Sequence, residues 1–206
     1  MTTRGIVLKK INYEESSVIM SVLTVDGVIS LMARYVKKGL RQYLPLTEPL
    51  TEISFDATKS KDMYYLKSGE LVDPFSEIKS NLDKISIANI ILEYSHLLSD
   101  AISNKKSYYD LVLLSLSSIT SSADPEIPLF KYLILLTKLL GITLKKDHLR
   151  SAYLMSDTCM ASLEALFNGE KIEERSELRL FFRSYFQNEM GVNPKSYDFY
   201  LSLFKE

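Results

Sequence analysis

VIMSVLTVDGVISLMA, residues 18–33, contains the hairpin signal from which the fold is predicted. Two runs rich in β-branched residues, 18–24 and 28–33, flank the dipeptide Asp26-Gly27. Asp-Gly is typical of a tight hairpin turn in which both central residues adopt positive φ. The two runs are therefore predicted to pair as neighbouring antiparallel strands.

Similar short runs on both sides of this hairpin extend the prediction to five strands. Each run is rich in β-branched or aromatic residues, and turn-forming residues separate the runs. The expected strands are 5–8, 18–24, 28–33, 50–55 and 63–71. Five short antiparallel strands favour a small closed barrel of the OB type over residues 1–72, although an SH3-like barrel would give a similar pattern.

A helical region is expected after Asp73, where the hydrophobic period changes from two residues to about 3.6. Pro74 marks the junction. Apolar positions from Ile78 to Leu92 form one stripe, and further amphipathic segments lie around 108–119, 128–140, 158–167 and 176–190. Gly141, Gly169 and Gly191 follow three of these segments, as is common at helix ends. Residues 73–206 are predicted to form a helical domain, which makes the fold class α+β.

Composition limits the kind of nucleic-acid binding that this chain could show. The formal net charge is −1 and the hydrophobic content is 46%, so affinity for nucleic acid would come from a local basic patch.

The single cysteine, Cys159, excludes a disulfide framework and a zinc site made of several thiolates, as expected in the cytoplasm. We expect neither a signal peptide nor a membrane span, because the longest apolar segment, 127–144, is interrupted by Lys131 and Lys138.

Residues 34–43, which we call the basic segment, form such a patch after the third expected strand. The segment carries Arg34, Lys37, Lys38 and Arg41 together with Tyr35, Gln42 and Tyr43, and it contains no acidic residue. Single-stranded DNA is bound by cations that replace its counterions and by flat side chains that stack on its bases. The segment is therefore predicted to bind single-stranded DNA. A solvated loop that only keeps the protein soluble is the alternative.

Catalysis is not indicated by the remaining reactive side chains. His96 and His148 lie far apart in the sequence and outside any nucleophile or metal motif. No glycine-rich phosphate loop is present, and no neighbouring cation would activate Cys159, which we expect to be a partly buried free thiol. We predict that the chain is not an enzyme and has no metal site and no cofactor.

A longer pattern runs through the first 50 residues: GIVLK at 5–9, YEES at 13–16 and the run 19–24, followed by Gly27, Ala33-Arg34, Lys37-Lys38 and Pro49. This pattern resembles the N-terminus of the RecO family, which are bacterial recombination mediators. The stretch 129–142, which ends in Leu-Leu-Gly-Ile, and residues 178–204 resemble later parts of the same family. The resemblance therefore extends over most of the chain and is most specific in the expected barrel.

The resemblance implies an OB-fold domain, a helical domain, and a protein that binds single- and double-stranded DNA and anneals complementary strands. With RecR, such a protein helps to load RecA onto strands coated with single-strand binding protein; whether RecF takes part stays open. The family's DNA contacts fall on Arg34, Lys37 and Lys38, whereas the loop chemistry at Arg41 and Gln42 is rearranged. Tyr35 stands where the family usually has glycine, which predicts a stiffer loop. A cytoplasmic, nucleoid-associated location is implied.

Many RecO proteins carry a four-cysteine zinc module, which this chain with its one cysteine cannot form, so the chain resembles a variant that lacks the module. The C-terminal domain of the family also resembles a receptor for the acidic, hydrophobic C-terminal tail of single-strand binding protein. Lys145, Lys146 and Arg150 are candidate cations for that tail, near the aromatic residues Phe181, Phe182 and Tyr185. Ordinary core packing is the alternative for these aromatic residues.

A protein-interaction adaptor is the rival interpretation of the whole chain. In it, the barrel has lost DNA binding and the helical domain docks a partner, as a net charge near zero would permit. Binding of a labelled single-stranded oligonucleotide distinguishes the two hypotheses.

Overall fold

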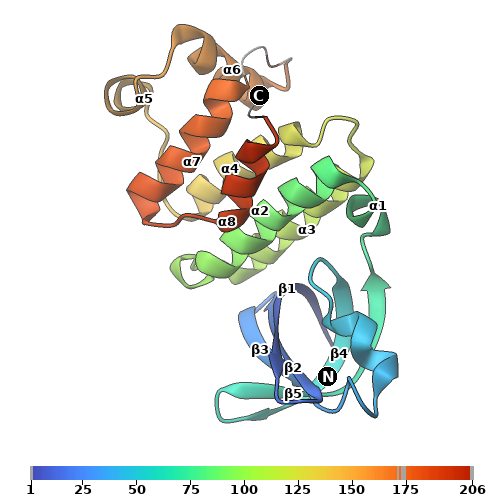
Figure 1. Cartoon of the computed structure of the whole chain (residues 1–206). Coiled ribbons are helices and arrows are strands. Elements are labelled where there is room, and N and C mark those ends of the chain that lie inside the picture. Colours follow the sequence, from blue (N-terminus) through green and yellow to red (C-terminus); the bar gives the residue numbers. More distant parts are fainter. Residues whose placement is uncertain (1, 171, 173–174, 205–206) are drawn as a thin grey trace.

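The strand-forming residues of the N-terminal part close into a barrel. In the computed structural model, which describes residues 2–170, 172 and 175–204, the strands are β1 (Thr3–Tyr13), β2 (Ser17–Thr24), β3 (Gly27–Ala33), β4 (Glu52–Ser60) and β5 (Met63–Asp73). Their order is β1-β2-β3-β5-β4, and β4 closes the barrel against β1 (Figure 1). The OB-type barrel and the α+β class predicted from the sequence are confirmed.

The prediction that all strands are antiparallel is wrong for one pair. β3 and β5 run parallel, with Leu31 opposite Tyr64 and Met32 opposite Tyr65, whereas the pairs β1–β2, β2–β3, β1–β4 and β4–β5 are antiparallel. Parallel neighbours need a long connection. Residues 34–62 supply it through a 3-10 helix, η1 (Arg41–Thr47), and the strand β4.

The β2–β3 hairpin is confirmed, but its turn differs from the expected one. Thr24 pairs with Gly27, so the loop consists of Val25 and Asp26, and of these residues only Gly27 has a positive φ, of 114°. The Thr24 hydroxyl donates to the Gly27 carbonyl at 2.9 Å and accepts from the Asp26 N–H at 3.2 Å. The glycine is therefore needed as the first residue of β3 and not as a central turn residue.

β1 and β4 differ most from their expected ranges, and β4, expected to end at residue 55, continues to Ser60. β1 was expected over residues 5–8, but it continues to Tyr13 because its pairing with β2 resumes after an irregularity between Val7 and Lys9. β4 begins at Glu52, since Leu50 has a φ of 56°, in the left-handed region that a strand residue does not adopt.

The chain leaves the barrel at Asp73 and continues as helices (Figure 1). They are α1 (Ser76–Lys79), α2 (Leu82–Leu97), the short 3-10 helix η2 (Ser99–Ala101), α3 (Lys105–Ser121), α4 (Glu126–Leu139), α5 (Lys146–Tyr153), α6 (Asp157–Asn168), α7 (Ser176–Met190) and α8 (Lys195–Ser202). None of the helices in the described part of the chain is long and apolar enough to cross a bilayer.

Helix ends follow the local signals in most places. Gly141, Gly169 and Gly191 have φ values of 76°, 76° and 67° after α4, α6 and α7, as predicted for helix-terminating glycines. The stripe expected from residue 78 to 92 is divided between α1 and α2, because the Asn81 side chain caps α2 by accepting from the Lys84 N–H at 3.0 Å. α5 was not predicted as a helix, since Leu149 is its one buried residue.

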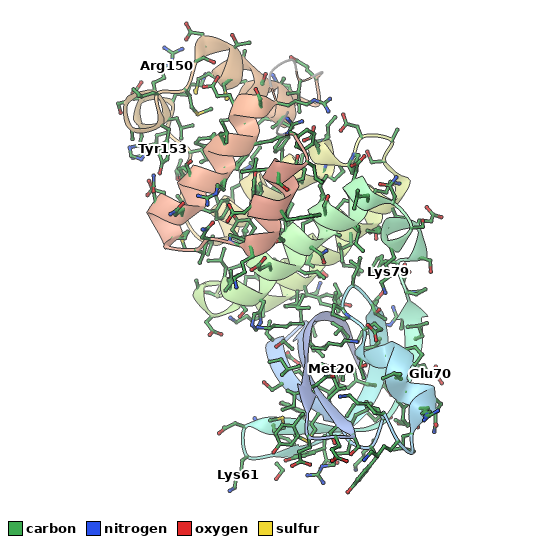
Figure 2. All side chains as sticks on the ribbon, viewed as in Figure 1. Met20, Lys61, Glu70, Lys79, Arg150 and Tyr153 are labelled. Atoms are coloured by element: carbon green, nitrogen blue, oxygen red, sulfur yellow. The ribbon has the colours of Figure 1, made fainter. Side chains whose placement is uncertain are left out.

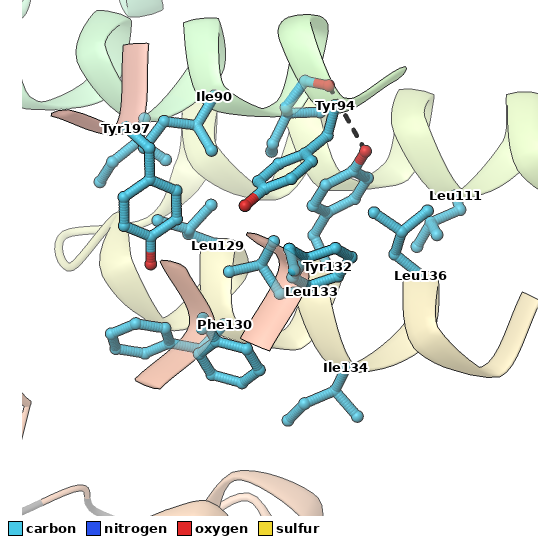
Figure 3. Packing of buried hydrophobic residues seen from close by; sticks show 14 of the residues in the cluster. Ile90, Tyr94, Leu111, Leu129, Phe130, Tyr132, Leu133, Ile134, Leu136 and Tyr197 are labelled. Atoms are coloured by element: carbon cyan, nitrogen blue, oxygen red, sulfur yellow. Dashed lines mark hydrogen bonds between the residues drawn. The ribbon is translucent and has the colours of Figure 1, made fainter. Parts of the chain in front are cut away.

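A continuous apolar cluster joins the helices to the barrel. The aromatic residues Tyr94, Phe130, Tyr132 and Tyr197 fill its centre between α2, α4 and α8 (Figure 3), and the cluster extends to Ile6, Leu8, Leu23 and Leu50 of the barrel. A second cluster around Met20 fills the barrel interior (Figure 2). The two parts therefore pack as neighbours, and the division into domains between residues 72 and 73 stays a prediction.

Candidate nucleic-acid interface

The basic segment begins where β3 ends and is held close to the barrel. Val36 is buried in the barrel cluster, and the Lys37 N–H donates to the carbonyl of Ser16 in the β1–β2 turn at 3.1 Å. The Tyr35 carbonyl accepts from the N–H groups of Lys38, Gly39 and Leu40 at 3.3, 2.8 and 2.9 Å. The charged side chains are thus carried by an ordered turn.

Tyr35 adopts the left-handed conformation, with a φ of 58°, and its side chain is 62% exposed. Left-handed backbone is costly for a residue with a Cβ atom, and glycine adopts it without this cost. The position therefore favours glycine, in line with the family pattern quoted above. The ring itself is free to meet a ligand.

Arg34 is exposed and lies against the sheet through an aromatic contact. Its guanidinium carbon stands 4.3 Å from the centroid of the Tyr65 ring. Tyr65 comes from β5, which the parallel pairing places beside β3. This cation–π contact orients the guanidinium while leaving its N–H groups free to donate.

A carboxylate approaches the basic segment, although the segment itself has none. The Lys38 ammonium donates to Glu15, which lies in the β1–β2 turn, and both side chains are largely exposed. An exposed pair of this kind contributes about 1 kcal/mol or less, so a phosphate can replace the carboxylate. Lys37 forms no ion pair with any residue that the structure describes.

The second half of the basic segment differs from the expected open loop. Arg41, Gln42 and Tyr43 begin η1, in which Arg41 and Gln42 are exposed and Tyr43 is half-buried against the barrel cluster. Tyr43 lines a cavity of about 370 Å³ together with the acidic residues Asp56 and Glu70. Acidic neighbours disfavour DNA at Tyr43, so Arg34, Tyr35, Lys37 and Lys38 are the better candidates.

The β4–β5 hairpin adds residues that the sequence analysis missed. The Lys59 ammonium lies 5.5 Å from the centroid of the Tyr64 ring, which is half-buried at the barrel cluster. Lys61, at the hairpin tip, has a φ of 54° and points away from the helices (Figure 2). The signal was a pair of lysines, at 59 and 61, followed closely by the adjacent tyrosines 64 and 65.

The candidate cations for a partner's acidic tail lie at α5, and two of them already have partners (Figure 2 labels Arg150). Lys146 pairs with Glu164 at 2.5 Å and Arg150 with Asp157 at 2.8 Å. Lys145 is exposed and has no ion-pair partner within the described chain. An acidic ligand would therefore have to displace two carboxylates or rely on Lys145.

The aromatic residues named with these cations belong to the core. Phe181, Phe182 and Tyr185 are buried, and the rings of Phe130 and Phe182 stack with centroids 5.7 Å apart. The core-packing alternative accounts for these three residues. Their exposed neighbours are Leu154 and Leu180, on the rim of a cavity of about 300 Å³ between α5 and α7.

The reactive side chains do not converge on a common site. His148 lies 3.3 Å from Glu189 on the surface, whereas His96 lies at the barrel–helix junction. Cys159 is fully buried, not partly buried as predicted. Among the described residues, no group of three or more histidine, cysteine, aspartate or glutamate side chains could hold a metal ion.

Comparison with known proteins assigns the barrel to a family. Residues 1–75 match the family described as recombination protein O N terminal. The chain is also similar to proteins named DNA repair protein RecO: 29% identity over 124 residues (60% of this chain, 51% of the relative) in Caldicellulosiruptor saccharolyticus, and 27% over 164 residues (79% and 63%) in Exiguobacterium sibiricum. A relative from Clostridium acetobutylicum is 35% identical over 92 residues, 44% of this chain and 37% of its own. The chain thus spans little more than half the length of the curated relatives it matches.

Proposed function

Because the chain belongs to the RecO family of DNA repair proteins, we propose that it is a recombination mediator that binds single- and double-stranded DNA and anneals complementary strands. With RecR, it assists the loading of RecA onto strands coated with single-strand binding protein. It acts without covalent chemistry, in the cytoplasm at the nucleoid. This proposal goes beyond the name of the relatives, which states DNA repair.

The arrangement around Arg34 is the observation that supports DNA binding most directly. Arg34, Lys37 and Lys38 leave the end of β3 together with the exposed Tyr35, and Arg34 lies against Tyr65 of a neighbouring strand. Cations that replace counterions and rings that stack on bases are the two features that single-stranded DNA requires. An ordered turn carries both.

Annealing follows from holding two strands on one protein. The basic segment neutralises the phosphates of one strand, and Lys38 exchanges Glu15 for a phosphate. Further basic surface accepts the second strand. Bringing both strands together lowers the entropic barrier to pairing, which needs no acid, base or nucleophile.

The test of the basic segment is the double charge reversal Lys37→Glu with Lys38→Glu. Fluorescence anisotropy with labelled oligo-dT is expected to show strong loss of affinity, and the logarithmic salt slope should flatten by about 1.4 or more, from roughly 0.7 per phosphate contact. The matched control reverses Lys106 and Lys131, two exposed lysines on α3 and α4. Wild-type affinity in the first variant would refute the assignment.

The partners are tested separately from DNA. Annealing of complementary strands precoated with single-strand binding protein, with and without RecR, measures mediator activity directly. For the acidic tail, Lys145→Glu should weaken binding of a labelled tail peptide, while Lys106→Glu should not. If wild-type protein binds no oligonucleotide at low salt, the adaptor hypothesis replaces this proposal.

A further inference from the structure

A groove crosses the junction between the barrel and the helices. It has a volume of about 550 Å³ and is lined by β1, α2 and α8. Figure 1 shows α8 lying beside α2, and α2 also packs against β1. Its lining includes Lys9, Lys10, Glu93, His96, Lys195 and Phe199. We call this site the junction groove.

The junction groove contains two lysines that are free to meet an anion. Lys9 and Lys195 are exposed and form no ion pair with any described residue, whereas Lys10 pairs with Glu48 at 2.6 Å. The groove's own carboxylate, Glu93, accepts from the backbone N–H groups of Lys195 and Ser196 at 3.0 and 2.9 Å. Glu93 thus fixes the start of α8 and keeps its negative charge, which interacts with that of Lys195. The two unpaired lysines, which come from different elements, outnumber this one carboxylate.

His96 contributes a half-buried ring to the lining of the junction groove. The Nδ1 atom of His96 is buried, and no described group lies within hydrogen-bonding distance of it. Burial, followed by the nearby charge of Lys9, lowers the pKa of His96, so the ring is neutral at neutral pH and can either donate or accept.

An exposed ring completes the junction groove. Phe199 on α8 is 52% exposed, and Leu97 on α2 is 46% exposed beside it in the lining. A flat ring next to separated cations matches the base and phosphate that every nucleotide carries. An acidic peptide would use the lysines without requiring a flat ring.

We propose that the junction groove binds a second segment of single-stranded DNA, with Lys9 and Lys195 on its phosphates and Phe199 stacked on a base. The proposal rests on the annealing function proposed above, which requires two strands on one protein. The basic segment then holds the first strand, at the end of the barrel where β3 terminates.

The test is the double variant Lys9→Glu with Lys195→Glu, compared with Lys106→Glu with Lys131→Glu. Two non-complementary oligo-dT strands, one with a donor dye and one with an acceptor, report by energy transfer when both occupy one protein. We expect the groove variant to lose the transfer signal and at least tenfold of the annealing rate, with the affinity for the first strand within about twofold of wild type. The control should retain all three properties.

The ring is tested by Phe199→Leu and Phe199→Trp, with Phe167→Leu as the matched control because Phe167 is 51% exposed elsewhere on the helices. Stacking predicts about a fivefold or larger loss of second-strand affinity for Phe199→Leu, retention for Phe199→Trp, and no change for the control. A glutamate-rich peptide that occupied the groove while DNA did not would overturn the proposal.

Failure of the inference and failure of the proposed function look different. If wild-type protein anneals strands and the groove variants do so equally well, the second strand binds elsewhere and the proposed function stands. If wild-type protein binds no oligonucleotide at all, both are wrong. Loss of transfer and of annealing in the groove variant, with the first-strand affinity preserved, supports the inference and, because the wild-type protein then anneals, the proposed function as well.

Discussion

The hydroxyl of Tyr109 on α3 donates a hydrogen bond to the carboxylate of Glu52 on β4 over 3.1 Å, and both residues are buried. Burial, followed by the charge of this carboxylate, raises the pKa of Tyr109. The bond joins the helices to the barrel, and its two residues lie 57 positions apart in the sequence. A buried carboxylate that loses a donor is costly, so this contact should help to hold the two parts in one arrangement.

Replacement of Tyr109 by phenylalanine should therefore destabilise the protein by about 1.5–3 kcal/mol, because Glu52 would lose a hydrogen bond to a charged group. Urea unfolding followed by circular dichroism measures the effect. Tyr153→Phe is the matched control, since Tyr153 donates to Glu189 at 2.7 Å on the surface, where water can replace it. If both variants lost the same free energy of unfolding, burial of the Tyr109–Glu52 pair would add nothing to the stability that its hydrogen bond provides.

A second buried carboxylate, Glu126, predicts how stability changes with pH. Arg179 contacts Glu126 at 2.6 and 3.0 Å, Arg175 contacts it at 3.2 Å, and the Tyr200 hydroxyl also donates to it. Burial raises the pKa of Glu126, but the hydrogen bonds from Arg179 and Tyr200 outweigh burial and hold the pKa below its ordinary value of 4.5. The stabilisation is therefore present above about pH 4.5 and is lost as the pH falls through the folded-state value.

Glu126→Gln should cost about 3 kcal/mol at pH 7, because it leaves the largely buried Arg179, 14% exposed, without its anion. The difference in the free energy of unfolding between this variant and wild type should become smaller as the pH falls from about 5 to about 3, because the wild-type carboxylate becomes protonated. Urea midpoints at several pH values test both expectations. Asp157→Asn, which breaks an exposed pair with Arg150, is the control and should change little at any pH. A difference that stayed constant with pH would contradict this account.

These contacts mark the limit of what could be predicted from the sequence. The β2–β3 hairpin and the helix ends at Gly141 and Gly191 depend on neighbouring residues, so local patterns predict them. The parallel β3–β5 pair and the Tyr109–Glu52 bond join distant residues, and no periodicity in one segment encodes its partner. Long-range pairing therefore had to come from the structure.

In the candidate site, too, local features could be predicted from the sequence and long-range contacts could not. The charges of Arg34, Lys37 and Lys38 are visible in the sequence because they are consecutive or nearly so. The approach of Glu15 to Lys38 and of Tyr65 to Arg34 depends on how turns and strands meet. The sequence thus pointed to the cations, but neither to the Glu15 carboxylate nor to the Tyr65 ring beside them.

Arg34 offers a test that separates charge from geometry. Arg34→Gln removes one cation and should flatten the logarithmic salt slope of oligo-dT binding by about 0.7. Arg34→Lys keeps the charge but lacks the planar group that lies on Tyr65, so the slope should persist while affinity falls. Anisotropy titrations between 50 and 200 mM salt, the range over which such slopes are large, provide the measurement. An unchanged slope in Arg34→Gln, as expected for the control Lys106→Gln, would remove Arg34 from the interface.

Tyr35 combines a backbone cost with a proposed gain in binding. Its left-handed φ of 58° is unfavourable by about 1–2 kcal/mol for a residue with a Cβ atom, and part of that cost is balanced by the greater flexibility of unfolded glycine. Tyr35→Gly should therefore stabilise the protein by roughly 0.5–1 kcal/mol, whereas Tyr35→Ala, which keeps the Cβ atom, should not.

Both variants remove the exposed ring, so both should weaken oligo-dT binding by about 1–3 kcal/mol if the ring stacks on a base. Unfolding and binding are measured on the same three proteins. If Tyr35→Ala binds as tightly as wild type, the ring does not stack on a base. Tyr35→Gly, unlike Tyr35→Ala, also frees the backbone that carries Lys37 and Lys38. If only Tyr35→Gly loses affinity for oligo-dT, the fixed turn supports binding and the ring does not.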